Sequence, residues 1–393
     1  ATAKWDKPTR DLIGLPERWD AREALGQAGY VSGDSLREIQ PDIVAAGFLA
    51  EVLDQEWDAR TPPELLWHAA RLAPDSVPGT LARLIHDTTS VLERESHLAE
   101  WLAEAVAGDV GRCEELEGFS SKDIAHNVAT VAVAIGKTLT ECAASEEEKA
   151  ARLNDLSVDL AATGDTAGAL QCIHEAVDIR RGLATANPAR FDPNLALSLN
   201  NLSVDLATTG DTVGALQAIQ EAVAIYRRLA QDNPARFEPN LASSLNNRSL
   251  RLADSGDPAG TLLDSQEAMD ILRRLSHTNP VRFEPNLALS LNYLSVHLAD
   301  SGDTAGALLA IQEAVGIQRR LVEANPVRFA PDLASSLRAR GPILERANRP
   351  DEALASYREG ADLVRASATA NPNSPAGKIF RQLQDAIDRL TAE

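Results

Sequence analysis

The chain of 393 residues is poor in sulfur-containing and aromatic side chains. It has three cysteines, one methionine and 4% aromatic residues. The cysteines, Cys113, Cys142 and Cys172, form no C-x-x-C pair, and their odd number leaves at least one of them without a partner. We therefore expect small buried thiols, and neither a disulfide framework nor a metal site.

Long apolar runs and positive charge are also scarce. No apolar stretch approaches the roughly 20 residues that a membrane-spanning helix requires. There are 38 Lys+Arg against 58 Asp+Glu, so the formal net charge is −20, and an acidic surface repels nucleic-acid phosphates and anionic lipids. The sequence predicts a cytoplasmic protein that binds neither nucleic acid nor membrane, and its 44% hydrophobic residues suffice for a folded core.

Motifs for catalysis and cofactor binding are missing as well. Gly136-Lys137-Thr138 resembles the end of a phosphate-binding loop, but Val131 stands where that motif requires glycine, and the segment reads as helix. His174-Glu175 lacks the second histidine of H-E-x-x-H, and G-x-S-x-G is absent. We expect no cofactor, no metal and no enzymatic activity; a hydrolytic enzyme is the last of three functional alternatives.

A 46-residue repeat organises the second part of the chain. Gly-Asp recurs from positions 164, 210, 256 and 302, and Asn-Pro from 187, 233, 279, 325 and 371. Leucines at 195, 199, 202 and 206 follow helical spacing, Gly210-Asp211 ends this helix and caps the next, and Asn233-Pro234 ends the second helix. We expect the segment 234–240 to be a loop. The pattern predicts an all-α solenoid of stacked helix pairs.

The repeat resembles the tetratricopeptide repeat. The signature L-G-x-x-Y…A-x-x-x-F is matched here by Leu202, Leu206, Ala215 and Ile219, with the spacing of 13 between Leu202 and Ala215 that this family shows. A standard unit has about 34 residues, so we expect the extra residues in a longer second helix and in the Asn-Pro loop. The Leu-Asn-Asn-Leu run at 199–202 is similar to the long repeats of kinesin light chains. The resemblance implies a right-handed α-solenoid that binds proteins or peptides.

We predict four regions along the chain. They are a winged-helix-like remnant at 1–55, a helical linker domain at 56–148, five repeats at 149–378 and a C-terminal capping helix at 379–393. A Ser-Gly-Asp turn within 30–40 predicts one short hairpin. Segments 28–44 and 48–53 resemble the join after the winged helix in signal-transduction NTPases with numerous domains, the STAND class. That resemblance implies an NTPase module upstream of Ala1.

The expected ligand site lies on the first helices of the repeats, which line the concave face in such solenoids. One position holds an amide in four repeats and an arginine in the fifth: Asn154, Asn200, Asn246, Asn292 and Arg338. These amides can hold the backbone of an extended peptide, or each can bond the neighbouring repeat and fix its rotation. Two other rows vary between repeats and are either specificity positions or drift on a solvated face: Ala162, Thr208, Asp254 and Asp300, and Asp159, Asp205, Arg251 and His297.

Arg248 departs from the repeat pattern. It stands where Leu156, Leu202 and Leu294 occupy the apolar stripe. A buried cation requires a partner, so we expect Arg248 to reach a carboxylate or the ligand. The predominance of arginine over lysine indicates a bacterial gene. The sequence thus predicts a peptide-binding scaffold that serves as the sensor or regulatory arm of a STAND-type signalling protein, with a free-standing adaptor as the alternative.

Overall fold

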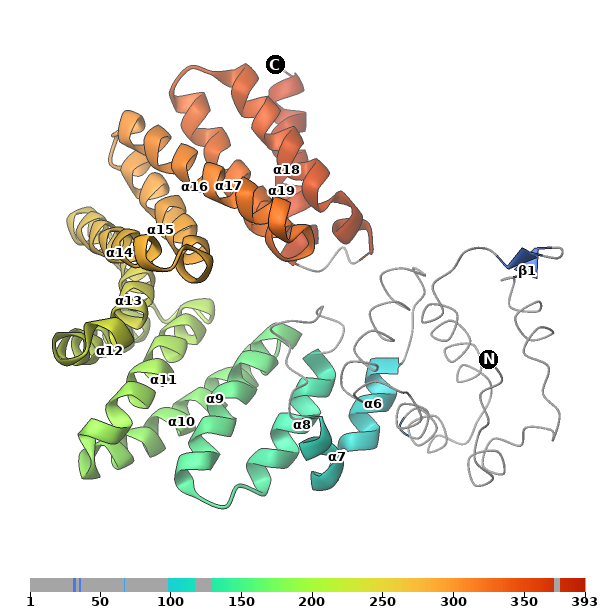
Figure 1. The fold of residues 1–393 in the computed structure, drawn as a ribbon, viewed down its shortest axis with the longest axis vertical. Coiled ribbons are helices and arrows are strands. Elements are labelled where there is room, and N and C mark those ends of the chain that lie inside the picture. The colour runs from blue at the N-terminus through green and yellow to red at the C-terminus, as the bar shows by residue number, and fades with distance from the viewer. Residues whose placement is uncertain are drawn as a thin grey trace. The chain divides into compact units, whose positions relative to one another are not determined.

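The computed structural model describes residues 31–32, 35–36, 67, 98–116, 129–370 and 375–392. Apart from one short hairpin the described elements are helices, so the predicted all-α solenoid of helix pairs is confirmed (Figure 1). In chain order they are β1 (Val31–Ser32), β2 (Ser35–Leu36), α6 (Leu98–Val106), α7 (Val110–Glu115), α8 (Ala129–Glu141), α9 (Glu146–Thr163), α10 (Thr166–Ala186), α11 (Pro188–Thr208), α12 (Thr212–Asp232), α13 (Pro234–Asp254), α14 (Pro258–Thr278), α15 (Pro280–Asp300), α16 (Thr304–Ala324), α17 (Pro326–Arg346), α18 (Pro350–Ala370) and α19 (Pro375–Ala392).

The chain divides into two compact units, Ala1–Cys172 and Ile173–Glu393, and α10 spans the division. In the first unit β1 and β2 pair antiparallel, with Ser32 opposite Ser35. The short hairpin predicted at 30–40 is therefore confirmed. The winged-helix interpretation of the segments around it lies outside the described residues, and the four predicted region boundaries stay a prediction.

Helix α8 is the centre of the described part of the first unit, where it packs against α6, α7 and α9. It contains Gly136 to Thr138, so the segment that resembles a phosphate-binding loop is helical, as predicted. Cys113 is buried, and burial raises the pKa of its thiol. Cys142, in contrast, is exposed. The expectation of a buried thiol is wrong for Cys142, because α8 ends at Glu141 and leaves this residue on the surface.

The second unit repeats one design, seen clearly in α11, α12 and α13. The first and second helices of a pair each have 21 residues. Gly210 adopts a left-handed conformation (φ 89°) between them, and the Asp211 side chain accepts a hydrogen bond from the Gly214 amide (2.9 Å). A single residue, Asn233, joins this pair to the next, because it ends α12 and also accepts from the Arg236 amide at the start of α13 (3.2 Å).

The segment 234–240 is helical, so the prediction of a loop there is wrong. Helix α13 begins at Pro234, whose missing N–H costs nothing in the first turn of a helix. The second proline, Pro239, lies inside the helix one turn later. Pro239 also suits the first turn of a helix, but Pro234 takes that place. The residues added to the standard repeat therefore lengthen both helices, and the connection between pairs is short.

The first helices form the inner layer of the second unit. The backbones of α11, α13, α15 and α17 each approach the next first helix, or α19 at the end, whereas consecutive second helices in the described part of the chain lie farther apart and are joined by side-chain ion pairs such as Arg227–Glu267. Helices approach one another more closely on the inside of a bend. Figure 1 shows α12 and α14 on the outer side of α13 accordingly. Among the described helices, none is both long enough and apolar enough to cross a membrane.

Candidate peptide-binding face

One face of each first helix remains uncovered after the helix pairs have packed. Helix α11 packs against α12, and its buried side holds Leu199, Leu202 and Leu206. The opposite side is exposed or half-buried and has the residue spacing of a single helix face. We call this face and its equivalents in α13, α15 and α17 the inner stripe: Leu197, Asn201, Val204 and Thr208; Ser243, Asn247, Leu250 and Asp254; Leu289, Tyr293, Val296 and Asp300; Ser335, Ala339, Pro342 and Arg346.

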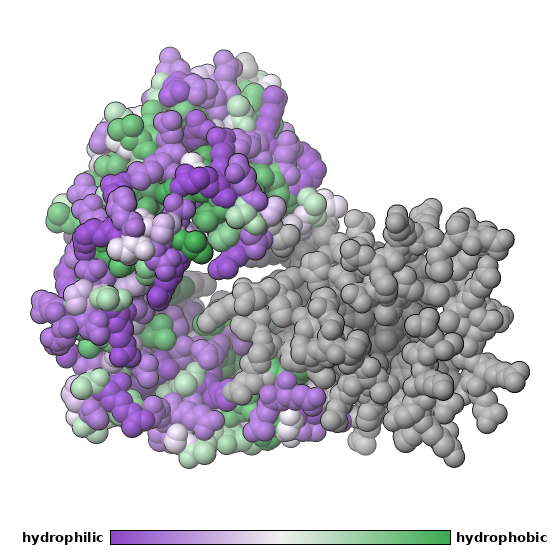
Figure 2. Space-filling model, viewed as in Figure 1, coloured by the Kyte–Doolittle hydropathy of each residue, from purple (hydrophilic) through white to green (hydrophobic). Residues whose placement is uncertain are grey.

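The inner stripe is apolar along much of its length and charged at one end. Leu197, Val204, Leu289 and Val296 are 38–46% exposed, whereas four other large hydrophobic residues of the described chain, Val213, Leu263, Val281 and Leu309, are 67–88% exposed. The C-terminal ends of the helices carry exposed Asp254 and Asp300 in addition to Thr208, and Arg346 donates two hydrogen bonds to one oxygen of Asp300 (both 3.1 Å). Figure 2 shows a surface on which hydrophilic residues predominate and hydrophobic ones form small patches. Exposed apolar side chains grouped on one helix face are typical of a binding surface.

The row of asparagines lies beside the inner stripe and is turned toward the neighbouring repeat. Asn246 is 5% exposed, and its side-chain oxygen accepts a hydrogen bond from the Ser290 hydroxyl of the next pair (3.0 Å). The Asn200 oxygen accepts from the Asn247 amide of the next pair (3.1 Å). Asn200 and Asn246 therefore form the hydrogen bonds to the neighbouring repeat that the sequence offered as the alternative to peptide binding. Their role in holding a peptide stays a prediction.

The other three residues of the row, Asn154, Asn292 and Arg338, have different surroundings. Asn154 is buried, and its amide donates to the neighbouring Asp155 carboxylate (3.3 Å). Asn292 is 9% exposed, and its side-chain oxygen has no hydrogen-bond partner among the described residues. The Nε of Arg338 is buried without a partner there as well. The bond between repeats seen at Asn246 is thus not formed at every pair.

Replacing Asn246 with alanine tests the role of this row in stability. The change leaves the buried hydroxyl of Ser290 without its partner, which costs about 1–3 kcal/mol. We expect a lower free energy of unfolding in urea by about that amount. The double variant N246A/S290A removes both groups and should recover much of the loss; equal stability of N246A and the wild type would contradict the assignment.

The second variable row, Asp159, Asp205, Arg251 and His297, contains side chains whose burial shifts their pKa values in different directions. Burial raises the pKa of Asp205 to about 6 and lowers that of the equivalent His297, which the nearby Asp300 opposes. Both shifts favour the neutral form of the side chain. At neutral pH the row therefore combines a carboxylate that is costly to ionise, a cation at Arg251 and a neutral imidazole.

Arg248 lies away from the inner stripe and reaches a carboxylate, as expected. Its Nε and Nη2 donate to the two oxygens of Asp264 on α14, at 2.5 and 2.6 Å. The side chains of Arg248 and Asp264 are 17% and 7% exposed. The participation of Arg248 in ligand binding stays a prediction, but its partner within the protein is now identified.

Sequence reasoning missed the apolar part of the inner stripe. A signal existed, because Leu197 and Val204 are seven residues apart and the same pair recurs as Leu289 and Val296. These apolar residues, on the side of the helix opposite the core leucines, mark a face that the helix pair does not bury. The amide row lies one residue, or about 100°, around the helix from this face.

These features define the class of the protein as an α-solenoid repeat scaffold. The tetratricopeptide repeat family model matches residues 150–184 and 195–235, which lie in the first two of the repeats. A search of curated proteins finds no match.

Three solved structures show the range of similarity. BtubC (BKLC) from P. vanneervenii is 18% identical, with a TM-score of 0.46 over 63% of this chain and 92% of that one. The second structure is a Podospora anserina protein described as a putative kinesin light chain with nearly identical TPR-like repeats. It is 16% identical to this chain, with a TM-score of 0.42 over 58% of this chain and 99% of that one. A Rap protein complexed with competence and sporulation factor is 12% identical, with a TM-score of 0.44 over 98% and 99%.

Proposed function

We propose that this chain is a non-enzymatic scaffold whose inner stripe binds a peptide segment of another protein. The observation that carries the proposal is the two exposed apolar pairs on the inner helices, Leu197 with Val204 on α11 and Leu289 with Val296 on α15. Burial of such side chains by a partner gains about 25 cal/mol for each Å² of apolar surface. Apolar side chains spaced to match these residues would anchor the partner.

Charge at the end of the inner stripe defines the partner further. Asp254 and Asp300 are exposed where the inner helices end; Arg251 and Arg346 pair with them there, while the chain as a whole is strongly acidic. A partner segment with basic residues beside its apolar anchors would therefore bind faster and in one orientation. The proposed ligand is an amphipathic segment with apolar anchors and a basic end.

The wider role we propose is that of a sensor or regulatory arm in a STAND-type signalling protein of the bacterial cytoplasm. It is supported by the resemblance of segments 28–44 and 48–53 to the join that follows the winged helix in that class. A ligand that bound one arrangement of the array more tightly would shift an attached NTPase module toward that arrangement. An adaptor that joins two proteins without such a switch is the alternative, and an upstream Walker motif in the same reading frame would decide for the sensor.

The binding face is tested by L289S/V296S, with L309S as the matched control. Leu309 is also exposed, at 72%, but lies on the second helix α16. Displayed peptides that are selected by the wild-type chain should bind L289S/V296S about tenfold or more weakly and L309S as before. The unfolding midpoint should change little, because all three side chains are already in contact with water. Equal binding by both variants would refute the inner stripe as the site.

The same selected peptides test the amide row. If the asparagines hold the peptide backbone, N200A/N246A/N292A loses binding beyond what its lower stability explains at a temperature where it is fully folded. Unchanged binding by the folded triple variant would leave the row with its role between repeats alone.

A further inference from the structure

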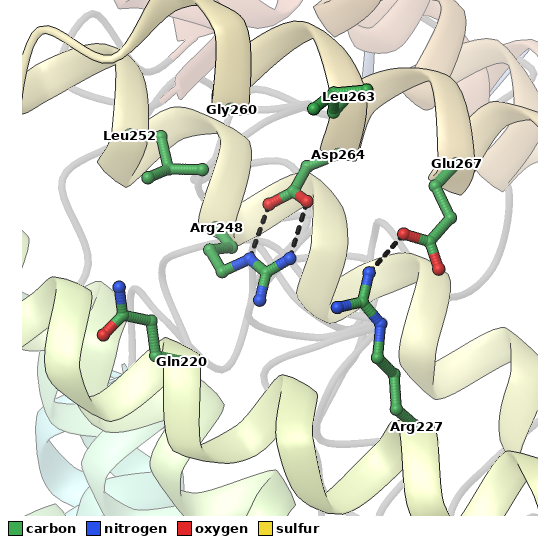
Figure 3. A pocket seen from close by; sticks show the side chains of 8 residues that line it. All are labelled: Gln220, Arg227, Arg248, Leu252, Gly260, Leu263, Asp264 and Glu267. Atoms are coloured by element: carbon green, nitrogen blue, oxygen red, sulfur yellow. Dashed lines mark hydrogen bonds and ion pairs between the residues drawn. The ribbon is translucent and has the colours of Figure 1, made fainter.

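A cavity of about 510 Å³ lies between α12, α13 and α14, apart from the inner stripe (Figure 3). Its volume is within the range of sites for small molecules. The side chains and backbone around it come from all three helices: Gln220, Arg227, Arg248, Leu252, Gly260, Leu263, Asp264 and Glu267.

Two of these residues distinguish this place from the same place in the neighbouring repeats. Arg248 replaces the leucine found at 202 and 294, and Asp264 replaces the alanine found at 218 and 310. Both changes occur in the same repeat, and the two side chains bond each other. The neighbouring repeats form the same helix pair with leucine and alanine, so the fold does not require the ion pair.

A second ion pair completes the polar wall of the cavity. Arg227 on α12 donates to Glu267 on α14. This contact belongs to a series that links consecutive second helices, with Arg273–Glu313 as the next member. The Arg227–Glu267 pair is therefore a general feature of the array, and the Arg248–Asp264 pair is the special one.

Hydrogen-bond donors of both arginines remain available to a ligand. Arg248 uses Nε and Nη2 for Asp264, and Arg227 uses Nη2 for Glu267. Figure 3 shows the third guanidinium nitrogen of Arg248 and a second one of Arg227 directed into the same space. A guanidinium group offers only donors, and its geometry matches a carboxylate. Two such groups that face one space form a place for a carboxylate group.

The charges of the cavity wall limit the class of ligand that can bind. Two arginines, Asp264 and Glu267 line the cavity, so the wall carries equal numbers of positive and negative groups and would not favour a simple anion. A ligand with both a carboxylate and an ammonium group matches it, and Glu267 has a second oxygen that Arg227 does not use. Leu252 and Leu263 add an apolar side.

We propose that this cavity is a site for a free α-amino acid with an aliphatic side chain. Arg248 and Arg227 bind its carboxylate, Glu267 binds its ammonium group, and Leu252 and Leu263 contact its side chain. The site is independent of the peptide-binding face, and either proposal can fail without the other.

Isothermal titration of the full chain with L-leucine tests the proposal, with leucinamide and 4-methylpentanoate as probes that each lack one charged group. We expect L-leucine to bind and each of the other two to bind about tenfold or more weakly, because each loses charge-assisted hydrogen bonds. Absence of binding by L-leucine to the folded chain would overturn the proposal. Equal binding by 4-methylpentanoate would overturn it as well, in favour of an anion site.

Variants locate the site. R248L/D264A restores the leucine and alanine of the neighbouring repeats and should lose binding of L-leucine while it stays folded, as circular dichroism would show. Glu267→Gln, at a partly exposed position, should weaken binding about tenfold and serves if the double variant does not fold. Glu313→Gln changes the equivalent pair one repeat further on and should bind as the wild type does. Unchanged binding by the folded R248L/D264A or by Glu267→Gln would place the ligand elsewhere and refute the assignment.

Discussion

Replacing Gly341 with alanine is expected to destabilise the last repeats severely. A Cβ at this position of α17 would lie 2.0 Å from Cζ and 2.1 Å from Cε1 of Tyr357. The ring cannot move aside easily, because it is 2% exposed and its hydroxyl donates to Glu345 (2.7 Å), which Arg389 also binds through both oxygens. Overpacking of a core commonly costs about 1–3 kcal/mol, and this contact with a fixed ring places the loss at the upper end or above.

Urea unfolding of G341A measures this loss, with Gly316→Ala as the control. A Cβ at Gly316, inside helix α16, meets nothing within 4 Å, so this change should stabilise the chain by about 0.5–1 kcal/mol through helix propensity. Serine and isoleucine occupy the two positions in α15 and α16, as Ser295 and Ile311. The double variant G341S/Y357I should therefore fold better than G341A. If G341A were as stable as the wild type, the packing of Tyr357 against α17 would be wrong.

Removing the carboxylate of Asp264 alone is the second change with a large expected effect. The variant Asp264→Ala leaves the guanidinium of Arg248 largely buried without its partner, and breaking a buried pair from one side costs about 3–5 kcal/mol. Arg248→Leu is expected to be costly for the same reason, because it strands the Asp264 carboxylate. Both losses should appear in equilibrium unfolding of the full chain.

Removing both partners should be nearly harmless. R248L/D264A has the residues that the repeats on either side already use, and replacing a buried pair by apolar residues is often neutral or stabilising. The double-mutant cycle should therefore show strong coupling between the two positions. Additive losses in the cycle would show that the ion pair does not exist as described.

The repeat and its helices could be predicted from the sequence because each local signal recurs at the same spacing. Gly210 and Asp211 mark a turn and a cap, and the structure uses them in both roles. The start of the first helices could not be placed, because two prolines, Pro234 and Pro239, both suit the first turn of a helix. Only the cap at Asn233, formed by its contact with the Arg236 amide, decides between them.

The candidate site was harder to predict because it depends on the orientation of each helix about its own axis. Asn200 and Asn201 are adjacent in sequence, yet the first belongs to the contact with the next repeat and the second to the inner stripe. A rotation of about 100° separates neighbouring residues on a helix, and sequence periodicity does not fix orientation that finely. The partner of Arg248 was within reach of sequence comparison, since Asp264 departs from its repeat position in the same unit.

The single-residue junctions have a consequence for how this protein can change its length. Asn233, Asn279 and Asn325 adopt nearly the same backbone angles, with φ between −144° and −150° and ψ between 81° and 88°. Each of these residues caps the helix before it and the helix after it. A gene duplication or deletion with both ends at such residues would therefore add or remove whole helix pairs and leave every cap intact. The protein can thus lengthen or shorten its array in steps of one repeat, and the length of the partner that it accommodates would change by the same step.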